Sequence, residues 1–183
     1  DLHSFPPRRS SDLAMLGCFA DAPHVGGIVT EVQEDRLEKF FHMLSTIMDE
    51  RRTALQGGNF TQYVQAYGLK LPAVLVVIDN FAGFRTKTND KYDDVLLRLS
   101  REGVGYGIYM VISASGFGIN DIPSRIGDNL RTIVSLEQPD KFKYMEIIRR
   151  THLQLIPETN IKGRGLAVID DRPLEIQTAL AME

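Results

Sequence analysis

The feature of this sequence that most constrains its fold is a nearly unbroken run of apolar and β-branched residues, LPAVLVVI, at Leu71–Ile78. Such a run predicts a strand that is buried on both faces, as in a parallel sheet covered by helices. The run ends abruptly at Asp79 and Asn80. Because ligands of open α/β sheets bind beyond the carboxyl ends of the strands, these two polar residues are candidates for a ligand site.

The rest of the chain alternates between helical and strand patterns. Helices are predicted at 34–52, 59–67, 89–103, 122–130 and 139–150. Strands are predicted at 107–113, 131–136, 165–169 and 174–178, the last two as a hairpin-like end. Strands that alternate with helices predict an α/β fold with a doubly wound parallel core and an antiparallel edge. A chain of 183 residues is long enough for one such domain, which we place at 14–183.

The composition excludes several classes of function. With a net charge of -3, the chain offers no global attraction for nucleic acid. Its single cysteine, Cys18, cannot form an internal disulfide, and its four histidines form no cluster with metal-ligand spacing. None of His24, His42 and His152 has a flanking hydrolase motif. The cysteine content fits a reducing, cytosolic location. No apolar run is long enough to span a bilayer, and the N-terminus has no apolar region that could act as a secretory signal.

The segment 1–13, DLHSFPPRRSSDL, has no usable periodicity and is rich in Ser, Pro and Arg. Its composition predicts disorder. It also resembles the translated read-through of a common sequencing adapter. We therefore expect 1–13 to be a non-native or disordered tail, and we exclude it from the predicted domain.

The chemistry expected at the end of the apolar run 71–78 is that of a metal-binding carboxylate. A hard cation such as Mg²⁺ prefers anionic oxygen ligands, often through one of its waters, and Asp79 is placed to supply one. An Asp that only caps the loop after the strand is the alternative interpretation. Asn80 carries an amide, which cannot accept a proton at neutral pH but can hydrogen-bond to a nucleotide or a water.

A phosphate-binding loop of the form G-x-x-x-x-G-K-[ST] does not occur in the sequence. Without it, no nest of backbone N–H groups surrounds a β-phosphate and no lysine neutralises it. Glycine-rich pieces at 103–107 and 116–118 lack the following helix and lysine, so we interpret them as turns. The main source of affinity for a triphosphate is therefore missing from this chain.

Several blocks, taken in order, resemble the ATPases of the FtsK/SpoIIIE family, and most of all the last ATPase module of the EssC/EccC motors of type VII secretion. They are APHVGGIV at 22–29, the charged helix at 34–52, LP at 71–72 leading to IDNF at 78–81, REGVGYGIY at 101–109, KGRGL at 162–166 and QTA at 177–179. The resemblance implies a P-loop NTPase fold of the RecA/FtsK type, with three α/β/α layers around a mostly parallel sheet. It also implies that the first strand and P-loop of that fold are not included.

The resemblance assigns roles to individual residues. Asp79 matches the Walker B aspartate, which would hold Mg²⁺ through water, and Asn80 stands where an active member has a catalytic Glu. Ser113 opens the segment that replaces a TQRP-like sensor. The arginines that could face a neighbouring subunit's nucleotide are Arg125, Arg131 and Arg164, and the alternative for each is a surface position or an ordinary ion pair. We expect ATP and Mg²⁺ in the full-length parent and neither on this chain.

Three functions remain open. The first is a degenerate ATP-binding domain of a secretion motor, without confident catalytic residues, at the inner face of the cell membrane through other parts of its parent. Its partners would be neighbouring ATPase domains, secreted proteins or further copies. The second is a non-enzymatic module that docks a substrate or partner in an apolar groove. The third, a fragment of a DNA translocase, is disfavoured by Asn80 and the altered sensor segment.

Overall fold

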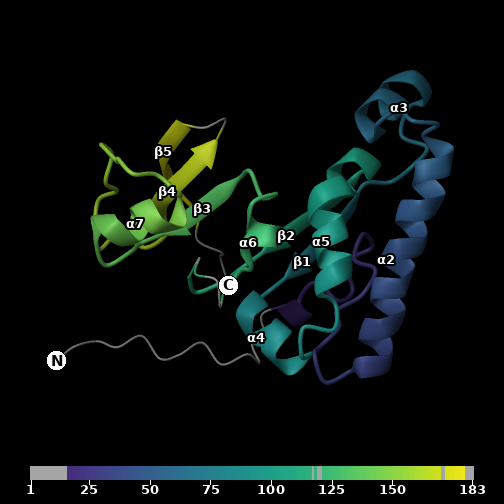
Figure 1. The fold of residues 1–183 in the computed structure, drawn as a ribbon, viewed down its shortest axis with the longest axis horizontal. Helices are drawn as coiled ribbons and strands as arrows, with labels where there is room; N and C mark the ends of the chain where they lie inside the picture. The colour runs from purple at the N-terminus through teal and green to yellow at the C-terminus, as the bar shows by residue number, and fades with distance from the viewer. Residues whose placement is uncertain (1–15, 117, 119–120, 170–171, 180–183) are drawn as a thin grey trace. The chain divides into compact units, whose positions relative to one another are not determined.

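The computed structural model describes residues 16–116, 118, 121–169 and 172–179. The tail predicted at 1–13 lies outside the described residues. The chain divides into two compact units, residues 1–113 and 114–183 (Figure 1). Each unit has its own secondary structure and is described by itself.

Among its described residues, the first unit contains the following helices, a 3-10 turn and two parallel strands. The elements are α2 (Glu34–Ala54), α3 (Phe60–Tyr67), β1 (Val74–Ile78), α4 (Phe81–Lys87), α5 (Asp93–Glu102), η1 (Gly103–Tyr106) and β2 (Ile108–Ile112). The register of the parallel pair runs from Val74 opposite Ile108 to Ile78 opposite Ile112. The two predicted apolar strands and their parallel pairing are confirmed.

The helices before β1 form for the reasons that the sequence indicates. In α2 the buried residues Leu37, Phe41, Leu44 and Met48 recur three or four positions apart, which places them on one face. The shorter α3 begins with a capping box, in which the Asn59 side chain accepts from the backbone N–H of Gln62 and the Gln62 side chain accepts from that of Asn59. Both helices match their predicted positions.

Only one face of the β1–β2 pair is covered. Val76 and Ile78 are buried, and α5 packs against β2 on that side (Figure 1). On the opposite face Leu75 is 62% exposed and Val77 is 59% exposed. The register sets Leu75 opposite Tyr109 and Val77 opposite Val111, and these partners are exposed too. The prediction that β1 is buried on both faces is therefore wrong within the first unit, because none of the described elements of that unit covers the second face.

A short helix follows β1 where we predicted a loop. Helix α4 spans Phe81–Lys87 and begins directly after Asn80, whose side chain accepts a hydrogen bond from the backbone N–H of Gly83. Phe81 is fully buried, so one side of the helix is anchored in the core. The short segment gives too few apolar positions for a helical period to be recognised.

The second unit contains α6 (Ser124–Gly127), β3 (Ile133–Leu136), α7 (Lys141–Ile147), β4 (Arg164–Ile169) and β5 (Arg172–Gln177). Its three strands form an antiparallel sheet in the order β3-β4-β5. The predicted closing hairpin is confirmed as β4 and β5. The third predicted strand, β3, pairs antiparallel with β4 and not with the parallel pair, so among the described strands only β1 and β2 are parallel.

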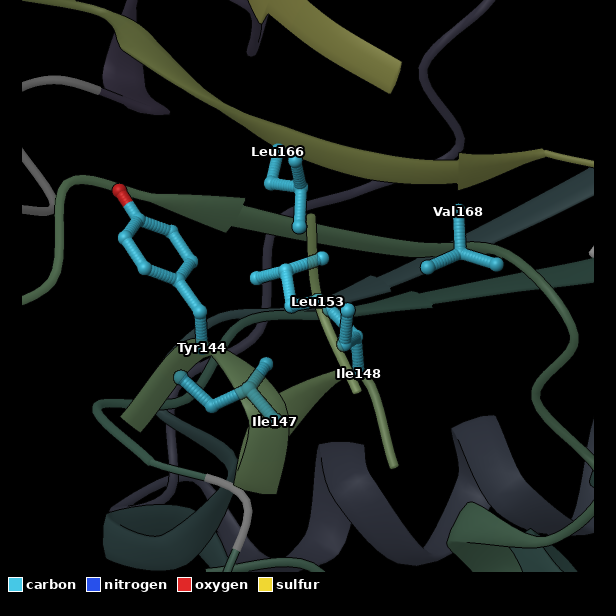
Figure 2. Close-up of a cluster of buried hydrophobic side chains, with 6 residues drawn as sticks. All are labelled: Tyr144, Ile147, Ile148, Leu153, Leu166 and Val168. Atoms are coloured by element: carbon cyan, nitrogen blue, oxygen red, sulfur yellow. The ribbon is translucent and has the colours of Figure 1, made fainter. Parts of the chain in front are cut away.

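The core of the second unit forms between α7 and the sheet (Figure 2). Tyr144 and Ile147 lie on α7, and Ile148 follows its last turn. They pack with Leu153 from the next segment and with residues of β4, so that the helix covers one face of the sheet. The β4 residues in this cluster are Leu166 and Val168.

Candidate functional site

The carboxyl ends of the two parallel strands bring Asp79 and Ser113 together. Because Ile78 is opposite Ile112 in the register, the next residue of each strand lies at the same edge of the sheet. The Ser113 backbone N–H donates to the carbonyl oxygen of Ile78 at 3.0 Å, which extends the ladder by one bond. The Ser113 hydroxyl donates to Oδ1 of Asp79. Two residues predicted separately for the site are thus direct neighbours.

Asn80 completes this cluster through its backbone and caps α4 with its side chain. Its N–H donates to Oγ of Ser113 at 3.0 Å, and its Oδ1 accepts from the backbone N–H of Gly83 at 3.3 Å. The backbone of Asn80 is left-handed, with φ 49° and ψ 60°, a conformation that asparagine adopts more readily than most residues. The Asn80 amide, predicted to be able to hydrogen-bond to a nucleotide or water, therefore uses its oxygen to cap the helix.

Asp79 presents its carboxylate to solvent at the edge where ligands of α/β sheets bind. A single exposed carboxylate fits Mg²⁺, which is commonly held by one or two carboxylates and takes its other ligands from water and phosphates. It does not fit a metal held by the protein alone, because the described stretches of chain contain no group of three or more His, Cys, Asp or Glu residues suited to an ion. Asp79 is thus a residue that could hold Mg²⁺ only with a phosphate ligand.

The three predicted arginines belong to the second unit, whereas Asp79, Asn80 and Ser113 belong to the first. Arg125 lies on α6 and Arg131 precedes β3, and both are exposed. Arg164 opens β4, and its Nη1 lies 3.5 Å from Oε1 of Glu175 on the paired strand β5. Arg164 thus forms the ordinary ion pair that was its alternative interpretation, and its role toward a nucleotide remains a prediction.

The sequence interpretation missed the part that α4 plays in the site. The N–H of Gly83 holds the Asn80 side chain, and an added Cβ at Gly83 would lie 2.5 Å from Nδ2 of Asn80. A side chain at position 83, three residues after Asn80, would therefore displace the Asn80 side chain from its cap. The signal was present in the sequence as an Asn followed at that spacing by Gly, with Phe81 and Phe84 on one side of the next turn.

No family model matches the chain. The type VII secretion system protein EssC of Staphylococcus aureus (strain MRSA252) is 29% identical over 167 residues, which cover 89% of this chain and 11% of EssC. The ESX secretion system protein EccC of Thermomonospora curvata is 26% identical over 160 residues, which cover 82% of this chain and 12% of EccC. The chain is a homologue of EssC and EccC. It spans about a tenth of the length of these curated relatives.

Solved structures support the same relationship at the level of the fold. The structure of EssC (ATPases 2 and 3) from Geobacillus thermodenitrificans matches with a TM-score of 0.64 and 23% identity, over 78% of this chain and 27% of that one. The pCW3 conjugation coupling protein TcpA, solved with ATPγS, matches with a TM-score of 0.67 and 22% identity, over 84% of this chain and 46% of that one. The chain therefore shares the α/β fold of these solved domains, as the resemblance predicted.

A membrane-spanning helix is not found in the part of the chain that the structure describes. The homology to EssC and EccC covers both units, so both belong to the region that these relatives share with the chain. Within this region, the described geometry gathers three predicted site residues at one sheet edge.

Proposed function

We propose that this chain is part of a nucleotide-binding module of a type VII secretion motor, in which Asp79 holds Mg²⁺ through a water molecule. The observation that carries the proposal is the exposed Asp79 carboxylate at the carboxyl end of parallel strand β1, hydrogen-bonded to Ser113 at the end of β2. The homology to EssC and EccC supplies the class of motor. In such a site the metal would neutralise the phosphates, and this chain's residues would orient it.

The module is proposed to bind nucleotide without efficient hydrolysis. A general base must accept a proton from the attacking water, and the amide of Asn80 cannot do so at neutral pH. Its oxygen is also occupied by the N–H of Gly83. We infer a regulatory or substrate-engaging ATPase domain that responds to the binding of nucleotide and not to its hydrolysis.

The longer parent would supply what this chain does not contain. The chain has no G-x-x-x-x-G-K-[ST] loop, so we expect ATP affinity to depend on other parts of the parent. Those parts would also provide neighbouring ATPase domains and the attachment to the inner face of the cell membrane. Secreted proteins are the proposed cargo, and further copies of the motor are proposed partners.

The test compares Asp79→Asn with Asp90→Asn in the full-length parent, using a fluorescent ATP analogue in the presence and absence of Mg²⁺. Asp79→Asn is expected to lower the Mg²⁺-dependent part of the affinity about tenfold or more, because the metal loses its charged ligand. Asp90 is an exposed carboxylate on a loop and serves as the control. Equal affinities for the two variants would contradict the proposal, as would micromolar ATP binding by the chain alone.

A second candidate function, docking of a protein partner, is favoured by the uncovered apolar face of β1 and β2. We define this face by Leu75, Val77, Tyr109 and Val111, all exposed. An open groove of about 520 Å³ continues from Tyr109 past Phe60, Val64 and Leu71. The occupant we propose is an apolar helix of a neighbouring ATPase domain in the same parent, since the solved EssC relative contains two such domains and this chain matches 27% of it.

Cross-linking from a cysteine at Val111 in the parent tests this second candidate. Cross-links to another ATPase domain are expected, whereas cross-links to a secreted protein would assign the face to cargo. If the cysteine at Val111 cross-links no more than a control cysteine at exposed Thr53, a docked partner is excluded.

The third function, a fragment of a DNA translocase, would instead be favoured by DNA binding that weakens steeply with salt.

A further inference from the structure

The Ser113 hydroxyl is a shared hydrogen-bonding centre at the candidate site. It donates to Oδ1 of Asp79 and accepts from the backbone N–H of Asn80 at 3.0 Å. A serine hydroxyl has one proton to donate. Because that proton is directed to Asp79, Ser113 is not arranged in this state to donate to a phosphate.

The backbone of Ser113 fixes the hydroxyl in this place. Its N–H donates to the carbonyl oxygen of Ile78 at 3.0 Å, and its carbonyl oxygen accepts from the N–H of Phe81 at 2.9 Å. Phe81 is fully buried at the start of α4. Ser113 is therefore bonded to β1 on one side of Asp79 and to α4 on the other, so its hydroxyl has a fixed position relative to the carboxylate.

The same contacts determine the backbone of Asn80. A left-handed residue that is not glycine is held by its surroundings. Here the surroundings are the Asn80 N–H bond to Ser113, the side-chain cap on Gly83 and the bond from the Phe84 N–H to the Asn80 carbonyl oxygen at 2.9 Å. Removing the Ser113 hydroxyl would free the Asn80 N–H and the Asp79 oxygen in one step.

We propose that Ser113 is a positioning residue, whose hydroxyl orients the Asp79 carboxylate and holds Asn80 in its left-handed conformation. This role deepens the proposed function, on which it rests for the meaning of Asp79, but the hydrogen bonds themselves need no ligand. One carboxylate oxygen, Oδ1, is committed to Ser113, which leaves Oδ2 as the oxygen that turns toward a hydrated metal.

The test uses NMR on the whole chain without nucleotide or metal. Ser113→Ala is expected to speed hydrogen exchange of the Asn80 amide roughly five- to tenfold, since one net hydrogen bond is lost. It is also expected to shift the carboxyl carbon resonance of Asp79. Ser113→Thr keeps the hydroxyl, so its Asn80 exchange rate and its Asp79 carboxyl resonance should match those of the unsubstituted chain. Ser115→Ala, two residues away at an exposed serine, is the matched control and should change neither.

The effect of losing the hydroxyl can be separated from the effect of changing the volume of the side chain. If Ser113→Ala does not fold, Ser113→Cys retains the shape with a weak donor and should show the same two changes. Unchanged Asn80 exchange and an unchanged Asp79 resonance in a folded Ala or Cys variant would overturn the proposal. A folded Ser113→Thr variant in which the Asn80 amide exchanges faster and the Asp79 resonance shifts, as in Ser113→Ala, would overturn it too.

The Mg²⁺-dependent affinity of the full-length parent for a fluorescent ATP analogue distinguishes this proposal from the proposed function. Ser113→Ala is expected to lower this affinity about threefold or more, because the carboxylate that receives the metal is no longer oriented. If Asp79→Asn leaves the affinity unchanged while exchange at Asn80 still depends on the hydroxyl, the metal assignment fails and the positioning role stands. If Asp79→Asn lowers the affinity and Ser113→Ala does not, the orientation of the metal-binding carboxylate by Ser113 is overturned.

Discussion

Arg51 binds the carbonyl oxygen of Pro72, and through this bond the end of helix α2 is tied to the start of strand β1. Its Nη2 lies 2.6 Å from that oxygen, and its Nη1 lies 2.6 Å from the carbonyl oxygen of Tyr106, just before β2. The guanidinium also lies over the Phe60 ring at 5.6 Å. Burial lowers the pKa of Arg51 from its usual value. A buried cation thus aligns the amino ends of both parallel strands, opposite the edge that carries Asp79.

Replacing Arg51 by Met should destabilise the first unit by about 2 kcal/mol. Met keeps much of the aliphatic stem but removes the donors to Pro72 and Tyr106, so the loss reports on the hydrogen bonds. The neighbouring Arg52 is exposed, and Arg52→Met should change the stability by less than about 0.5 kcal/mol. Urea titration of amide resonances from β1 and β2 measures both. Equal stability of the two variants would show that the carbonyl contacts contribute nothing.

Gly107 offers a second test of the same end of the sheet. Its φ is 72°, and an added Cβ would lie 2.5 Å from atoms of the Phe60 ring. Gly107→Ala should therefore cost about 2 kcal/mol or more, from backbone strain together with the clash. An added Cβ at Gly105 meets open space, so Gly105→Ala should be neutral within about 0.5 kcal/mol. Thermal unfolding of both variants measures these changes in stability. If Gly107→Ala leaves the stability unchanged, the prediction is wrong and the Phe60 ring moves aside at little cost.

The sequence predicted best those features that depend on local patterns. The apolar run before Asp79 identified β1, and the helical spacing of Leu37, Phe41 and Leu44 identified α2, because burial of a periodic face is the main determinant of each element. The hydrogen bond between Asp79 and Ser113 was not predicted, since it depends on the register of two strands 34 residues apart. Each residue was nevertheless a candidate, Asp79 because it directly follows an apolar strand and Ser113 because the family resemblance placed it at the start of the sensor segment.

The two wrong or missing predictions have a common physical cause. The double-sided burial expected for β1 was inferred from apolar content, which specifies that a face can be covered but not which segment covers it. Helix α4 was missed because it is short and is stabilised mainly by the cap from Asn80 and the burial of Phe81. Contacts between elements, and not propensity, determine both features.

Acid should weaken the contact between Glu31 and Lys87, which joins the segment before α2 to α4. The hydrogen bond from Lys87 lowers the pKa of Glu31 from its ordinary value of 4.5. The stabilisation is therefore present above that ordinary value and is lost as the pH falls through the lowered pKa. Because Lys87 is 44% exposed, solvent screening limits the pair to about 0.5 kcal/mol at neutral pH.

A double-mutant cycle of Glu31→Gln and Lys87→Gln, repeated from pH 7 to pH 3, measures this dependence. The coupling energy should be constant above about pH 5 and should fall toward zero in acid. The cycle cancels contributions that either residue makes to other groups. A coupling energy that stays constant, or that grows as the pH falls, would contradict the assignment.

The uncovered face of β1 and β2 predicts self-association of the isolated chain. Leu75 and Val77 leave apolar surface in water on a sheet that has two strands among the described residues, and exposed apolar sheet surface favours aggregation. Changing Leu75 and Val77 together to Thr should lower the associated fraction in sedimentation experiments and alter the stability by less than about 1 kcal/mol, since both side chains are exposed.

Val76 provides the control, because it lies between Leu75 and Val77 and is only 4% exposed. Val76→Thr should cost about 1 to 3 kcal/mol, because it buries a hydroxyl, and should not reduce association. A chain that is monomeric before any substitution would mean that exposed apolar surface on this face is tolerated without a partner.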